Sequence, residues 1–254
     1  MTTRKALRRV ARALGVESQA LAVRQRFLPA EVRRDIRDNE LLIALLERTL
    51  APGSDCLDVG AHTGLVLGEM VRLAPRGRHV AWEPLAEYAQ RLRTEFPTVE
   101  VREAALSDRA GERSFAHPLA DPGWSSFLER PTPGGGPVET LTVRTERLDD
   151  ALPDGVRPAF VKIDVEGAEE LVLRGALETL RRHRPPIAFE HGLGSAEYYG
   201  TTPEGIHDLL AGELGYAIHG MDGDGPYTRE QFAGIFARAE RVNFVADPGG
   251  AART

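Results

Sequence analysis

Carboxylates end two apolar runs of the sequence, each at the point where the run gives way to a helix or a loop. Asp164 closes the run 159–164, and Glu190 and His191 close the run 186–191. If the two runs are adjacent parallel strands, their ends share the edge of the sheet where ligands bind. We therefore predict that Asp164, Glu190 and His191 meet in one crevice. They could remove a proton from a hydroxyl group or hold a divalent cation such as Mg²⁺ that lowers the pKa of that hydroxyl.

A glycine turn follows an earlier apolar run, in CLDVGAHTG. Asp58 comes two residues before Gly60, and Gly64 follows at the start of a predicted helix. This is not the dinucleotide pattern G-x-G-x-x-G, and a carboxylate at Asp58 would repel a pyrophosphate. The Asp58 carboxylate would instead suit a cationic ligand. Glu83 lies 23 residues after Gly60, a spacing typical of an acid that accepts ribose hydroxyls. The pattern favours an adenosine ligand with a positive centre, such as S-adenosylmethionine.

Alternating strands and helices position these residues. Apolar runs predict strands over 55–59, 78–82, 98–102, 159–164, 186–191, 215–220 and 240–246. Helical patterns predict helices over 64–73, 84–95, 167–180, 203–213 and 229–239. This alternation indicates a parallel sheet with right-handed crossovers.

Residues 103–158 lack a clear helix, and we predict a hairpin there that pairs 112–117 with 138–144. Its connecting loop, 121–137, contains Trp124 and several Gly and Pro residues. Loops of this length are usually functional or disordered. We expect this one to select the substrate or to close as a lid.

The N-terminal residues 1–37 are basic, with ten Arg or Lys against three acids, whereas the whole chain carries a net charge of −6. We predict a helical extension over 1–37, with a helix at 4–28, followed by one domain over 38–254 that begins with a helix at 38–49. The acidic total argues against a general nucleic-acid binder, and no run is long and apolar enough to span a membrane. The single cysteine indicates a reducing, cytoplasmic setting. A homodimer through the N-terminal helices is a further expectation.

The chain resembles the FkbM-type methyltransferases, which depend on S-adenosylmethionine. The matching motifs are LDVGAHTG, AWEP, EAALSDRAGE, RTERLDD and VKIDVEGAEELVLRG, in family order over about 38–246. The resemblance implies the α/β class I methyltransferase fold, a Rossmann-like doubly wound seven-stranded sheet with its last strand antiparallel. It also implies methyl transfer, usually to oxygen.

The same resemblance implies roles for individual residues. Asp58, Gly60 and Gly64 should line the methionine part of the cofactor, Glu83 its ribose, and Ala105 and Asp108 its adenine. His62 stands in the cofactor-binding turn where the family commonly has Asn.

The expected function is therefore O-methylation of a small hydroxylated metabolite, either a sugar or a natural-product scaffold. Two alternatives remain: a methyltransferase-like domain that binds cofactor or a partner without turnover, and a nicotinamide-dependent oxidoreductase. Asp58 and the glycine pattern argue against the latter.

Neighbouring charged residues have plainer interpretations. We expect Glu166, Glu169 and Glu170 to be acids of a helix N-terminus, stabilised by the helix dipole. Lys162 lies inside an apolar run, and we expect it to be an ion-paired structural group.

Overall fold

The computed structural model describes residues 30–249 of a chain that divides into two compact units, Met1–Leu42 and Ile43–Thr254. The helix predicted over 4–28 lies outside the described residues. Helix α3 runs from Ala30 to Thr49, so it begins eight residues before the predicted start at 38. Among the described helices, none combines the length and the apolar character needed to cross a membrane.

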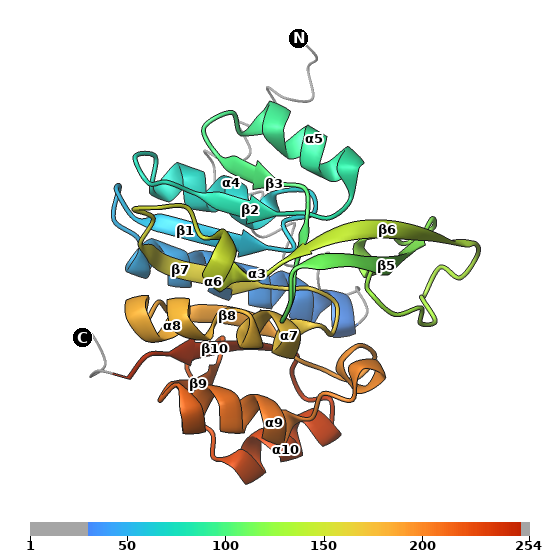
Figure 1. Ribbon diagram of the computed structural model, residues 1–254. Helices are drawn as coiled ribbons and strands as arrows, with labels where there is room; N and C mark the ends of the chain where they lie inside the picture. Colours follow the sequence, from blue (N-terminus) through green and yellow to red (C-terminus); the bar gives the residue numbers. More distant parts are fainter. Residues whose placement is uncertain (1–29, 250–254) are drawn as a thin grey trace, which may run out of the picture. The chain divides into compact units, whose positions relative to one another are not determined.

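A seven-stranded sheet forms the centre of the second unit (Figure 1). In spatial order its strands are β3 (Glu100–Arg102), β2 (Val80–Trp82), β1 (Asp55–Val59), β7 (Pro158–Ile163), β8 (Ile187–Glu190), β10 (Asn243–Asp247) and β9 (Ala217–Gly220). The first five strands pair in parallel, and β10 is antiparallel to both of its neighbours. The predicted doubly wound sheet with an antiparallel last strand is confirmed.

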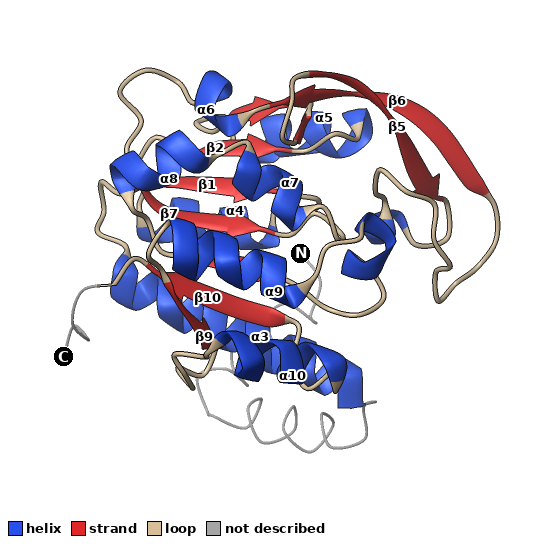
Figure 2. Cartoon of the chain, turned by 60° about the horizontal axis from the view of Figure 1, so that its bottom comes forward, coloured by secondary structure: helices blue, strands red, loops and turns tan. Residues whose placement is uncertain are grey.

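Helices cover both faces of this sheet (Figure 2). They are α4 (Leu65–Leu73), α5 (Ala86–Glu95), α7 (Glu169–Arg174), α8 (Leu177–His183), α9 (Pro203–His207), which continues into the π-helical turn η3 (Asp208–Glu213), and α10 (Arg229–Ala237). Successive side chains of β2 point to opposite faces of the sheet, so they pack against both helical layers. Val80 and Trp82 pack in the core shared with α7, α8 and α9, whereas Ala81 packs with α4 and α5.

The predicted helix over 167–180 is two helices, because the helical conformation is interrupted at Gly175, directly after α7. A Cβ atom at Gly175 would overlap the carbonyl oxygen of Ser107. The break therefore lets the backbone pass close to the segment that enters the second sheet.

A smaller three-stranded sheet stands beside the main one, in the order β4 (Ala105–Leu106), β6 (Val138–Glu146) and β5 (Gly111–Pro118). Strands β5 and β6 pair antiparallel, which confirms the predicted hairpin. Strand β4 and helix α6 (Leu148–Ala151) are too short to show in the sequence pattern. Two 3₁₀ turns, η1 (Pro122–Trp124) and η2 (Ala196–Tyr199), lie in the segments after β5 and β8.

Candidate active site

The carboxyl ends of β1, β2, β7 and β8 lie at one edge of the parallel part of the sheet. Asp58 lies in β1, directly before the glycine turn, and Glu83 follows β2. Asp164 follows β7, and Glu190 is the last residue of β8. Of the three residues predicted to meet in one crevice, Asp164 and Glu190 do lie together at this edge.

The glycine turn after β1 is pressed against the end of β7. Gly60 has a φ of 79°, and a Cβ atom there would overlap the carbonyl oxygen of Asp164. Gly64 has a φ of 78°, and its Cβ would lie 2.6 Å from a Leu92 methyl and 2.7 Å from the Phe96 ring. Both positions require glycine for backbone conformation and for space.

Lys162 links the acids of β1 and β7. Its Nζ lies 3.1 Å from Oδ2 of Asp164 and 3.7 Å from Oδ1 of Asp58, and it donates to the carbonyl oxygen of Gly60 at 3.2 Å. Burial disfavours the ammonium, but Asp164 and Asp58 together raise the Lys162 pKa above its usual value. The prediction that Lys162 is ion-paired is confirmed. Its partners, however, include the candidate base.

Asp58 is fully buried, and neither of its carboxylate oxygens has a hydrogen-bond partner among the described residues. Burial raises the Asp58 pKa, and the nearby Lys162 ammonium opposes that rise. Lys162 at 3.7 Å from Oδ1 partly balances this charge, and the hydrogen-bonding capacity that the carboxylate leaves unused fits a ligand that brings a cationic donor.

Glu83 and the glycine turn hold each other in place. The Glu83 carboxylate accepts hydrogen bonds from the backbone N–H groups of His62 (2.8 Å) and Leu85 (2.9 Å). Burial raises the Glu83 pKa to about 7, against the effect of these two donors. The His62 ring lies 4.4 Å from that of Tyr88, and its Nε2 is buried without a partner among the described residues.

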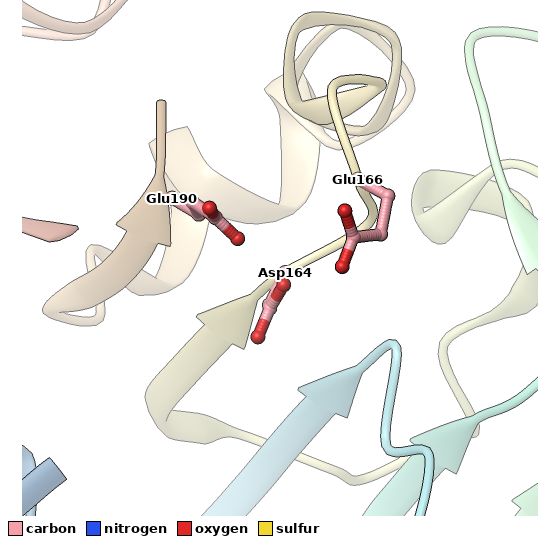
Figure 3. A group of neighbouring side chains, drawn as sticks. All are labelled: Asp164, Glu166 and Glu190. Atoms are coloured by element: carbon pink, nitrogen blue, oxygen red, sulfur yellow. The ribbon is translucent and has the colours of Figure 1, made fainter. Parts of the chain in front are cut away.

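Three carboxylates converge at the ends of β7 and β8 (Figure 3). Asp164, Glu166 and Glu190 each offer an oxygen within 4.8 Å of the other two. Glu166 lies in the turn after β7, with a φ of 58°. This position is outside α7, so the interpretation of Glu166 as an acid of a helix N-terminus is wrong.

The three carboxyl groups differ in pKa. Burial opposes ionisation of Asp164, but Lys162 and a hydrogen bond with Glu190 hold its pKa below the usual value. Burial, followed by the charges of Asp164 and Glu166, raises the pKa of Glu190 well above its usual value. Burial and Asp164 raise the pKa of Glu166 to about 7, against the nearby Arg130. The electrostatics therefore favour the ionised form of Asp164 and the protonated form of Glu190.

His191 does not join this group, contrary to the sequence prediction. Successive residues of a strand point to opposite faces, so the side chain after Glu190 leaves the crevice. The His191 ring stacks on two aromatic rings, with its centroid 4.8 Å from that of Phe236 and 5.8 Å from that of Phe232. The side chain of His191 is fully buried. Burial lowers its pKa to about 4. The structure therefore gives His191 a neutral place in the core, beside α10.

The two residues predicted to lie beside the adenine follow β3. Asp108 lies next to Gly175, the residue that follows α7. Ala105 packs against the cluster that contains Leu85 and Phe115, close to the end of β2. The adenine-binding role of both residues stays a prediction.

Arg130, which the sequence analysis did not single out, belongs to this site. It lies in the predicted functional loop, pairs with Glu166 and donates to the carbonyl oxygen of Gly194 at 2.6 Å. Its guanidinium stacks over the Trp124 ring at 4.6 Å. One Arg in a Gly- and Pro-rich loop carries no sequence signal that distinguishes it from a solvated charge.

Comparison with known proteins places these features in a family. The sequence model described as "Methyltransferase FkbM domain" matches residues 58–218. The chain is 30% identical to the 2-O-methyltransferase NoeI of Sinorhizobium fredii over 163 residues, which are 56% of this chain and 64% of NoeI. It is 42% identical over 82 residues to the AMB antimetabolite synthetase AmbE of Pseudomonas aeruginosa, covering 31% of this chain and 4% of AmbE. The match thus spans less than two thirds of either curated relative.

Among solved structures, an FkbM methyltransferase from Methylobacillus flagellatus is similar at 16% identity and a TM-score of 0.48. That alignment covers 78% of this chain and 44% of the other.

Proposed function

This chain belongs to the FkbM family of S-adenosylmethionine-dependent methyltransferases, and on that premise we propose that it transfers the methyl group to a hydroxyl group of a small metabolite. The observation that carries the proposal is the position of Asp164 at the end of β7, where Lys162 pairs with its carboxylate and the glycine turn packs against its backbone. The name of one relative, the 2-O-methyltransferase NoeI, supports oxygen as the receiving atom.

The cofactor fits the residues along this edge. Bound S-adenosylmethionine supplies an electrophilic methyl group on a sulfonium. Asp58 offers two buried oxygens without hydrogen-bond partners, which suit the cofactor ammonium. Glu83 is oriented by two backbone N–H groups, so its remaining acceptor positions suit ribose hydroxyls.

Asp164 is the proposed general base. An alcohol is a poor nucleophile until its proton is removed, and a carboxylate must be ionised to accept that proton. Lys162 keeps Asp164 ionised, while Glu190 carries the proton of the pair. As the acceptor oxygen bonds to the methyl carbon and the carbon–sulfur bond breaks, the hydroxyl proton passes to Asp164.

In the alternative mechanism a divalent cation activates the hydroxyl group, and its ligands in the structure differ from those predicted from the sequence. Asp164, Glu166 and Glu190 are an oxygen-rich set that fits Mg²⁺ better than a set containing His191. A cation held there would lower the pKa of the acceptor hydroxyl. Lys162 and Arg130, however, already pair with Asp164 and Glu166. We therefore propose activation by the base, without a metal.

Incubation with methyl-labelled S-adenosylmethionine tests the function. The acceptor panel contains sugars and phenols, each with an amine analogue, and mass spectrometry locates the label. We expect label in ether linkages, release of one S-adenosylhomocysteine per product, and loss of transfer in Asp164→Asn. Label confined to the amines would contradict transfer to oxygen.

A further inference from the structure

Five large apolar side chains of the described residues are exposed, and some of them lie in segments that contact the candidate active site. They are Leu65, Leu119, Leu128, Leu193 and Tyr198. Leu65 follows the glycine turn. Leu119 and Leu128 lie between β5 and β6, and Leu193 and Tyr198 follow β8. Single exposed apolar residues are ordinary, but three of these, Leu128, Leu193 and Tyr198, lie on segments that contact one another, which indicates a surface that binds a ligand.

Two hydrogen bonds hold three of these residues in neighbouring segments. Arg130 donates to the carbonyl oxygen of Gly194, which ties the backbone next to Leu128 to the backbone next to Leu193. The Phe127 N–H donates to the Tyr199 hydroxyl at 2.9 Å. Because Tyr198 adjoins Tyr199, we name Leu128, Leu193 and Tyr198 together the apolar lip.

Arg130 links the segments of the apolar lip to one of the three carboxylates. Arg130, two residues after Leu128, pairs with Glu166 and is 5% exposed. The guanidinium of Arg130 is therefore turned inward, where it pairs with Glu166. A second polar group of the region is also occupied, because the Glu197 carboxylate accepts from the Gly194 N–H at 2.7 Å. Leu128, Leu193 and Tyr198 face solvent at the lip, with the side chains of Glu129 and Glu197 exposed beside them.

We infer that the methyl acceptor carries its reactive hydroxyl on an apolar body, which packs against the apolar lip. The inference rests on the proposed function, since the acceptor must reach Asp164 and the lip borders that approach. Burial of an exposed Leu or Tyr against a ligand lowers the free energy of the complex. An acyl or aryl body gains this energy, and a bare sugar does not. The alternative occupant is a second copy of the chain.

Two glycosides with the same hydroxyl groups test this inference: n-octyl β-D-glucoside, used below its critical micelle concentration, and methyl β-D-glucoside. Calorimetry measures the dissociation constant of each for the full-length protein saturated with S-adenosylhomocysteine. Each buried methylene contributes about 0.8 kcal/mol, so burying even two of the seven extra methylenes makes the octyl compound bind about tenfold more tightly. The triple variant L128S/L193S/Y198S should reduce that ratio to about threefold or less, and Leu119→Ser should leave it unchanged.

Equal binding of the two glycosides to the wild-type protein, or no binding of the octyl compound, would overturn the inference. So would a triple variant that keeps the wild-type ratio, including one that only turns a dimer into a monomer in sedimentation velocity. The proposed function fails separately, through absence of S-adenosylhomocysteine binding or of methyl ether product.

Discussion

Replacement of Lys162 by Met tests whether a neighbouring ammonium keeps Asp164 ionised. The change removes the charge 3.1 Å from Oδ2 of Asp164 and keeps an unbranched apolar side chain. Without that charge, burial and the nearby Glu190 and Glu166 should raise the pKa of Asp164.

The size of this effect follows from the distance. Coulomb's law gives about 1.3 kcal/mol for unit charges at 3.1 Å in a dielectric of about 80, and about 5 kcal/mol in one of about 20. The Asp164 side chain is 40% exposed, so solvent screening favours the lower part of this range. Since about 1.4 kcal/mol corresponds to one pKa unit, we expect the Asp164 pKa to rise by about one to two units.

The assay is the pH dependence of single-turnover methyl transfer. In the wild-type enzyme the rate falls as pH drops through the pKa of the ionised base. This fall is the acidic limb of the pH–rate profile. In Lys162→Met the limb should move to a pH that is higher by at least about one unit, so that activity recovers at alkaline pH. Lys162→Arg keeps the charge and should keep the limb near its wild-type position.

Lys162→Met also leaves the buried Asp58 without its cation, so a lower melting temperature is expected, and each rate is measured well below that temperature. An acidic limb that stays in place while the rate falls at every pH would refute the role of Lys162.

Four further substitutions test the site and the core beside it. Asp164→Asn should lower the single-turnover rate by about 10²–10⁴-fold, whereas Glu190→Gln should cost less than about tenfold, because the amide mimics a carboxyl group that is already protonated; similar losses in both would contradict the assigned protonation states. Asp58→Asn should weaken S-adenosylhomocysteine binding in calorimetry without changing the acidic limb of the rate. His191 is neutral in the folded state and gains a proton on unfolding below its ordinary pKa of 6.5, so wild-type stability should fall between pH 7 and pH 5 by about 2 kcal/mol more than that of His191→Phe, measured by urea unfolding; equal pH dependence would place the imidazole in contact with solvent.

The alternation of apolar runs and helical patterns was sufficient to predict the main sheet, because its central strands are buried between two helical layers and are mostly apolar on both faces. The ends of those strands then placed Asp164 and Glu190 correctly. His191 was misplaced although the reason is local: adjacent residues of a strand point to opposite faces, so Glu190 and His191 do not both face Asp164.

Other features depend on contacts distant in the chain, and no periodicity reveals them. Strand β4 has two residues and exists because β6 pairs with it. Arg130 reaches Glu166 across 36 residues of sequence, so neither residue shows its partner locally. Glu166 was interpreted as an acid of a helix N-terminus because α7 was expected to start at 167, whereas it starts at Glu169.

Calorimetric titration with S-adenosylhomocysteine, with NAD as the comparison and with and without prior chelation, tests the central claim most directly. The account predicts tight binding of S-adenosylhomocysteine, no binding of NAD, and the same affinity after chelation. Absence of S-adenosylhomocysteine binding by the folded protein would contradict the assignment of the glycine turn, Asp58 and Glu83 to the cofactor. Loss of affinity on chelation would instead indicate that Asp164, Glu166 and Glu190 bind a metal ion.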